Sequence, residues 1–193
     1  MNRNITAAAA AGLFMATALA GPVQAQTVSE DLPFEVIIPD YAENPEAALA
    51  VAARRNAWRE TFERQDVEGM MSFYVPEIYS YDLMAAPEAD GLKLAFDGEA
   101  IWRRNWVAFF DMFEDDLEVT IENLTVYQSG DIATVRGLTR LQGTMTSGQY
   151  VDMWSRETNV LRRIDGAWLV VHDHVSVPMD FATGQALTTL SPD

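Results

Sequence analysis

The sequence predicts a single α+β domain in which helices pack against a curved antiparallel sheet. Before residue 114, apolar residues recur at helical spacing, with one alternating strand pattern among the helices. From residue 117 onward they alternate with polar residues between tight turns, as in strands joined by hairpins. Helices followed by such a meander indicate an α+β domain. The curved sheet and its helices would make a cone with a pocket inside.

Residues 1–25 have the pattern of a secretory signal peptide. A single positive charge, Arg3, precedes an apolar run from Ala7 to Ala20, and small residues occupy the −3 and −1 positions before a cut after Ala25. The apolar run is shorter than the roughly 20 residues that a membrane-spanning helix needs. We therefore expect a periplasmic or secreted protein that is not inserted in the membrane after cleavage.

The rest of the chain divides into a tether, one domain and a tail. Residues 26–43 contain prolines and acids around a short apolar strip, and we expect them to run along the domain as an extended tether. The domain is expected over residues 44–180, a length that suits one hydrophobic core. Residues 181–193 would form a C-terminal tail.

The first two helices carry start signals. Asn44 is predicted as an N-cap, with Pro45 in the first turn and an acid near the positive end of the helix dipole. Asp66 is predicted as the N-cap of a short second helix that ends by Pro76. The apolar stripe of the first helix consists of Val51, Trp58 and Phe62.

A third helix is predicted after Asp97, which we expect to cap it. Its aromatic residues are spaced by four, three and four positions: Trp102, Trp106, Phe109 and Phe113. Such a stripe usually packs in the core, and we favour that interpretation over a ligand-stacking role.

The strands are predicted from alternation. In residues 77–83, Ile78, Ser80 and Asp82 share one face, while the tyrosines on either side of Ser80 share the other. Four more strands, separated by turns at 129–131, 147–149 and 165–166, are predicted over residues 117–123, 132–144, 150–164 and 167–177.

Charge and composition exclude several function classes. The formal net charge of the chain is −16, and such a surface repels phosphate backbones and anionic lipid heads. Nucleic acid is therefore not an expected partner. The chain has no cysteine, which excludes disulfides, thiol catalysis and thiolate metal sites.

Four stretches of the chain resemble the NTF2-like superfamily, in its SnoaL-like and ketosteroid-isomerase-like branch. They are AWRETFERQDVEGMMSFYVPEIYSYD, FDGEAIWRRNWVAFF, RETNVLRRIDGAW and WLVVHDHVSVP. The last two also resemble the association domain of calcium/calmodulin-dependent kinase II. The resemblance covers residues 45–180 and implies the NTF2-like cone. It does not imply one function, because this fold hosts isomerases, cyclases, hydrolases, dehydratases and non-catalytic dimer modules.

The resemblance implies a role for Asp82. Ketosteroid isomerases place a general-base Asp at the end of the strand after the second helix, where this chain has Asp82. Their oxyanion hole pairs a first-helix Tyr with a protonated Asp on a later strand. Here the Tyr position matches Trp58, and the later position, near residues 158–160, has no acid. We therefore expect the electrophilic half of that mechanism to be missing, with Asp82 as a possible base.

The two histidines of the chain, His172 and His174, flank Asp173 in the last strand. Alternation places both imidazoles on one face with Val170, and Asp173 on the other.

Three interpretations of this stretch remain open. A metal site would need a third ligand, and the chain has no Cys and no further His. In an acid–base site, Asp173 or a histidine would carry the proton. In a packed sheet, the imidazoles would bond to Arg156 or Glu157.

Two functions are compatible with this sequence. The first is binding of a small apolar molecule without turnover. The alternative is a cofactor-independent isomerase, cyclase or hydrolase that uses Asp82 with Asp173, His172 or His174.

We expect neither a metal nor a cofactor. The protein is expected to form a homodimer through its sheet. The candidate ligand-binding residues are Trp58, Tyr81, Trp102, Trp106 and Trp154.

Overall fold

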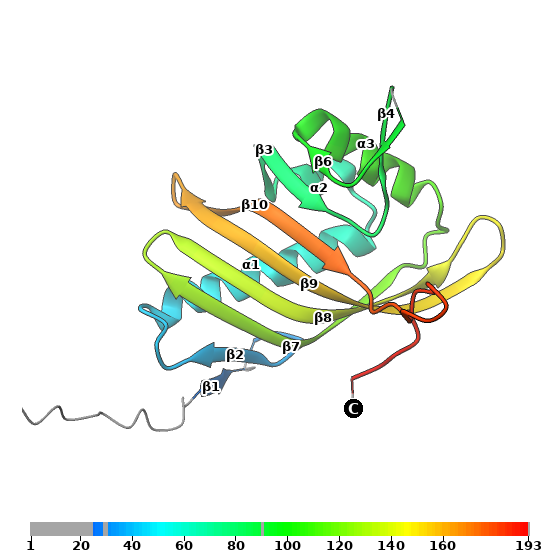
Figure 1. The fold of residues 1–193 in the computed structure, drawn as a ribbon. Coiled ribbons are helices and arrows are strands. Elements are labelled where there is room, and N and C mark those ends of the chain that lie inside the picture. The colour runs from blue at the N-terminus through cyan, green and yellow to red at the C-terminus, as the bar shows by residue number, and fades with distance from the viewer. Residues whose placement is uncertain (1–24, 29–30, 90, 193) are drawn as a thin grey trace, which may run out of the picture.

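The predicted α+β cone is confirmed by the computed structural model, which describes residues 25–28, 31–89 and 91–192. An eight-stranded curved sheet has α1 lying along one of its faces, with α2 and α3 near the end formed by β3 and β6 (Figure 1). The helices are α1 (Pro45–Glu63), α2 (Val67–Met71) and α3 (Glu99–Phe110).

The sheet has the order β1-β2-β7-β8-β9-β10-β3-β6, and it is antiparallel except where β2 meets β7 and β3 meets β10. A separate hairpin joins β4 and β5. The strands are β1 (Ala25–Val28), β2 (Val36–Pro39), β3 (Tyr74–Tyr81), β4 (Ala86–Glu88), β5 (Gly91–Lys93), β6 (Phe96–Asp97), β7 (Glu118–Ser129), β8 (Ile132–Thr144), β9 (Tyr150–Ile164) and β10 (Ala167–Ser176). The predicted bounds of the strands now labelled β8 and β9 are confirmed.

The segment expected as a tether belongs to the sheet. β2 pairs with β7 and also with β1, and its side chains Val36 and Ile38 are buried. The predicted signal peptide lies outside the described residues except for Ala25. None of the helices within the described ranges has the length and apolarity that crossing a bilayer requires.

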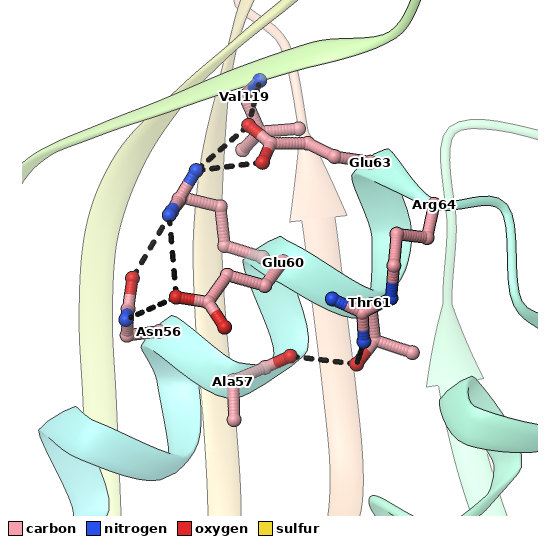
Figure 2. Close-up of polar contacts among 8 residues, drawn as sticks. Asn56, Ala57, Glu60, Thr61, Glu63, Arg64 and Val119 are labelled. Atoms are coloured by element: carbon pink, nitrogen blue, oxygen red, sulfur yellow. Dashed lines mark hydrogen bonds and ion pairs between the residues drawn. The ribbon is translucent and has the colours of Figure 1, made fainter. Parts of the chain in front are cut away.

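The first helix is fixed at both of its ends. The Asn44 side chain accepts a hydrogen bond from the Ala47 N–H at 3.1 Å, which confirms the predicted cap. Near the other end, the Glu63 carboxylate accepts a hydrogen bond from the Val119 N–H of β7 at 3.0 Å (Figure 2). Arg59 holds the same carboxylate with two bonds of 2.7 and 2.8 Å. These contacts set the position of α1 against the sheet.

The second predicted cap is confirmed and the third is wrong. The Asp66 carboxylate accepts a hydrogen bond from the Gly69 N–H at 2.9 Å at the start of α2. Asp97 instead ends β6, where it pairs with Tyr79, and Gly98 occupies the N-cap position of α3. Gly98 has φ 90°, a left-handed conformation that glycine adopts without strain. This turn separates the strand from the helix.

The last strand contains an irregularity that simple alternation does not predict. A β-bulge between Val170 and His172 shifts the register of β10 against both β9 and β3. An extra residue in one strand changes which side chains share a face. Val170 therefore faces inward with Asp173, and the prediction that it shares a face with the histidines is wrong.

Candidate functional site

A cavity of about 100 Å³ lies between the helices and the inner face of the sheet. Most of its wall is apolar, and aromatic side chains from α1, α3 and the start of β3 contribute to it. Polar side chains interrupt this wall, and they come from α1, β3 and the residue after it, α3, β8, β9 and β10. Pockets that bind small molecules have this composition, with a mainly apolar lining and a few placed polar groups.

Asp173 is the most deeply buried carboxyl group of this wall. Its side chain lies on the inner face of β10 and is 5% exposed. The Asn159 amide on β9 donates a hydrogen bond to Asp173 Oδ1 at 2.5 Å. Burial raises the pKa of Asp173 well above its ordinary value, the charges of Glu157 and Asp82 raise it further, and Arg55 opposes the rise. Asp173 is therefore placed to hold a proton where an exposed carboxyl would be ionised.

Asp82 lies on the same cavity, just beyond the end of β3, in a more polar environment. Its Oδ1 accepts a hydrogen bond from the Met84 N–H at 3.1 Å, and its Oδ2 accepts one from the Asn105 amide at 3.4 Å. Burial raises the pKa of Asp82, whereas the N–H groups of Met84 and Leu83 and the Asn105 amide oppose the rise. These donors favour the ionised form of Asp82.

A buried ion pair forms another part of the wall. Arg55 of α1 and Glu157 of β9 bond to each other, and their side chains are 7% and 10% exposed. The Arg55 guanidinium also stacks over the Trp58 ring at 3.8 Å and reaches the Thr139 hydroxyl at 3.3 Å. Each charge has an opposite partner, which is how buried charges are tolerated.

A phenol group is the third proton-carrying group on the cavity. The Tyr74 hydroxyl accepts a hydrogen bond from the Trp58 indole N–H at 2.8 Å. Burial raises the pKa of Tyr74 well above its ordinary value, and the Asp173 charge adds to the rise. Because the indole can only donate, the Tyr74 O–H remains available as a donor. Tyr74 and Asp173 thus line the cavity from positions other than the two at which the resemblance placed a Tyr and a later Asp.

The structure separates the candidates that the sequence suggested. The cavity wall includes Asp82, Asp173, Trp58 and Trp106. The lining does not include His172, His174, Tyr81, Trp102 or Trp154. Trp102 is fully buried in the core against Phe96, as the packing interpretation of the aromatic stripe predicts.

The histidines lie on the outer face of the sheet. His172 and His174 both contact the Tyr81 ring, at centroid distances of 5.2 and 5.6 Å. His172 Nδ1 lies 2.7 Å from the Tyr79 carbonyl oxygen. The packed-sheet interpretation offered Arg156 or Glu157 as partners of the imidazoles, and Glu157 is not available to them because its carboxylate faces inward to Arg55. Asp173 alone of the three residues reaches the cavity.

Sequence reasoning missed several of the polar residues on the wall, although two of them leave a signal. Arg55 lies four residues after Val51 and three before Trp58, so it interrupts the apolar stripe of α1. Asn105 interrupts the stripe of α3 in the same way, and both side chains are buried. A polar residue at an apolar position of a helix therefore marks this site. Within the described ranges, no group of three or more His, Cys, Asp or Glu side chains is placed to hold a metal ion.

Comparison with known proteins agrees with this fold. An NTF2-like protein of unknown function from Pseudomonas putida is 26% identical with a TM-score of 0.68, covering 77% of this chain and 99% of its own. A ketosteroid isomerase-like protein from Erwinia carotovora is 21% identical with a TM-score of 0.56, over 69% of this chain and 97% of its own. The CaMKII association domain of C. elegans is 19% identical with a TM-score of 0.52, over 68% and 95%.

The comparison with curated proteins finds no match. The profile of the SnoaL-like domain matches residues 51–180, which contain every residue of the cavity wall. This range runs from the first helix through the last strand, so the match and the cavity describe the same unit. The chain belongs to the SnoaL-like domain family, within the NTF2-like fold.

Proposed function

We propose that the cavity binds a small, largely apolar carbonyl compound and that Asp82 and Asp173 catalyse proton transfer on it. The observation that carries this proposal is the convergence of two carboxyl groups on one mainly apolar cavity. Pairs of titratable groups with different environments are typical of acid–base sites, since one stays ionised while the other keeps its proton. Asp82 has three hydrogen-bond donors around it, whereas Asp173 is more completely buried.

The two groups support one reaction step. The ionised Asp82 carboxylate removes a proton from the carbon beside the ligand carbonyl, and the electron pair of that C–H bond moves toward the carbonyl oxygen. Protonated Asp173 and the Tyr74 O–H donate hydrogen bonds to this oxygen, which becomes negative as the proton leaves. Return of a proton from Asp82 to the same carbon restores the ketone, with isotope exchange in heavy water, whereas its return to a conjugated carbon completes an isomerisation.

The proposal is tested by hydrogen exchange in heavy water. Cyclohexanone is incubated with the protein in D₂O, and deuterium incorporation next to its carbonyl is followed by NMR. We expect exchange above the buffer rate, and Asp82→Asn should lower it at least about a hundredfold, the lower range for a general base. Asp173→Asn should also lower it. Asp115→Asn, at an exposed position, is the control with the wild-type rate.

Binding without turnover is the second candidate function, and the apolar lining of the cavity favours it. Aromatic and aliphatic side chains bind an apolar ligand by burying its surface, and this requires no proton transfer. Cyclohexanone that binds in the cavity but exchanges no faster than in buffer would support this function and would contradict the acid–base proposal. Native mass spectrometry of protein purified from its own host can then identify the bound molecule.

We also propose that the protein is exported and cleaved. The signal-like pattern of residues 1–25 supports this proposal. Mass spectrometry of the protein from the periplasm or medium should find Gln26 as the first residue. A soluble protein that retains Met1 to Ala25 would contradict it.

A further inference from the structure

Two oxygen atoms on the inner face of β9 have no hydrogen-bond partner within the described part of the chain. Arg55 bonds to Oε2 of Glu157, which leaves Oε1, and the Asn159 amide nitrogen donates to Asp173, which leaves the amide oxygen Oδ1. Both oxygens keep accessible surface, because neither is among the five unpartnered polar atoms of the described residues that are closed off from solvent. They can therefore accept a hydrogen bond from a bound molecule.

The accessible surface of these two oxygens opens into the cavity. Glu157 and Asn159 are separated by one residue in β9, so their side chains project from the same face of the sheet. Glu157 reaches Arg55 of α1, Asn159 reaches Asp173, and both side chains line the cavity. A second hollow that the same side chains border has no room for a water molecule. A ligand in the cavity can thus contact both oxygens.

The chemistry of the two oxygens determines which group they can bind. An ionised carboxylate accepts hydrogen bonds and cannot donate them, and the same is true of an amide oxygen. The Glu157 side chain is 10% exposed, and a charged acceptor that is so little hydrated forms a strong bond with a donor. The Tyr74 O–H and protonated Asp173 are donors instead, and they suit a carbonyl oxygen. The cavity wall therefore offers acceptors for one part of a ligand and donors for another.

We propose that Glu157 and Asn159 form a subsite that accepts a hydrogen bond from a hydroxyl group of the ligand, with the charged Glu157 oxygen as the main acceptor. A hydroxyl is a neutral donor, whereas an ammonium group would leave water for a mainly apolar cavity in which Arg55 already neutralises Glu157. The substrate class is then a small cyclic hydroxyketone. This inference rests on the proposed function only for the place of the carbonyl, because Glu157 accepts the bond whether or not Asp82 transfers a proton.

The test compares two probes of equal size, 4-hydroxycyclohexanone and 1,4-cyclohexanedione. They differ at one ring position, where the first has a hydroxyl that can donate and the second has a carbonyl that can only accept. Dissociation constants are measured by ligand-observed NMR. The wild-type protein should bind the hydroxyketone at least about tenfold more tightly, since a carbonyl oxygen forms no bond with Glu157.

Glu157→Gln should reverse the polarity of the subsite. Arg55 can only donate, so the amide oxygen of the variant faces Arg55 and its N–H groups face the cavity. The ratio of the two affinities should fall to one or below. The double variant Arg55→Met, Glu157→Met removes both charges together, a change that buried ion pairs often tolerate, and its ratio should be about one.

Glu63→Gln is the matched control, because Glu63 also pairs with an arginine, Arg59, but does not line the cavity. It should keep the wild-type ratio. Thermal melts verify that each variant is folded. A wild-type ratio of one or less, a ratio that neither change at Glu157 lowers, or binding of neither probe would overturn the subsite. A hydroxyl preference without deuterium exchange of cyclohexanone would overturn the acid–base proposal and leave the subsite standing.

Discussion

Asp173 is a carboxyl group that folding takes almost completely out of water. Its bond with Asn159 and the nearby Arg55 charge offset only part of the cost, because the charges of Glu157 and Asp82 oppose ionisation. A stable fold alone would favour an apolar residue at this position of β10. The raised pKa of Asp173 supports the proton-carrying role that we propose for it in the cavity.

We predict that Asp173 makes folding stability depend on pH in a particular direction. The folded protein binds this proton more tightly than the unfolded chain, so the stabilising contribution is complete below the ordinary Asp pKa and is lost as the pH rises through the raised pKa. Asp173→Asn should remove this loss. Urea unfolding across the acid and neutral range should show a smaller decline of unfolding free energy toward high pH in the variant than in the wild type.

Asp116 provides the control of opposite sign. Its exposed carboxylate accepts hydrogen bonds from the Thr144 hydroxyl and N–H, and these bonds lower its pKa. The contribution of Asp116 is therefore present above the ordinary Asp pKa and is lost on acidification. Asp116→Asn should reduce the loss of unfolding free energy that the wild type shows on acidification. It should leave unchanged the decline toward high pH that Asp173 causes. Identical pH profiles for wild type and Asp173→Asn would contradict the prediction.

At the scale of elements, local patterns predict two of the three proposed caps and several of the strands, and they fail where the tertiary structure decides. The bounds of β8 and β9 were predictable from alternation and from the turn residues between the strands. The cap at Asn44 was predictable because an Asn side chain can accept a hydrogen bond from the first turn of a helix. The bulge in β10 leaves no comparable signal, because residues 168–171 are an unbroken apolar run that assigns no residue to one face. This one bulge places Val170 beside Asp173 on the inner face, and it could not be predicted from spacing alone.

The residues of the candidate site could also be predicted only in part, because some of its contacts join residues that are distant in the sequence. Asp82 could be found by resemblance and Asp173 by its apolar neighbours in sequence. The contact of Trp58 with Tyr74, by contrast, joins side chains from α1 and β3 whose pairing depends on how the helix lies on the sheet. Arg55 and Glu157 are separated by about a hundred residues of chain and meet only in the folded cone. Such pairs are determined by packing, which no local pattern contains.

The position of α1 on the sheet depends on Glu63, and this gives a prediction for the element. Glu63→Ala would leave the Val119 N–H of β7 without its acceptor and Arg59 without its two-bonded partner (Figure 2). We expect a loss of about 1–3 kcal/mol in unfolding free energy, the range for a buried donor left unsatisfied.

Glu60→Ala on the same helix is the matched control for Glu63. Glu60 bonds to Asn56 and Arg59 at the surface, and its side chain is half exposed. Exposed ion pairs contribute about 0–1 kcal/mol, so this variant should lose much less stability. Chemical unfolding of both variants gives the comparison. Equal losses would show that the contact from Glu63 to β7 does not hold the helix in place.

For the whole molecule, the outer face of the sheet carries an aromatic cluster made by Tyr79, Tyr81, His172 and His174. The tyrosines are 40% and 43% exposed, and their rings contact each other at 5.5 Å. These four side chains do not line the cavity. Because exposed apolar clusters often mark protein interfaces, we propose that this face covers the same face of a second copy.

The homodimer is tested by placing a charge in this cluster. In a two-fold interface the same surface of each copy is buried, so Tyr81→Glu would bury two negative charges, one from each copy, in one interface. Analytical ultracentrifugation at micromolar concentration should give about twice the monomer mass for the wild type and the monomer mass for this variant. Val107→Glu is the control, since Val107 is 44% exposed on α3, the helix that lines the cavity on the inner side of the sheet, and this variant should remain dimeric. A monomeric wild type would contradict the dimer, and a dimeric Tyr81→Glu would show that another surface forms it.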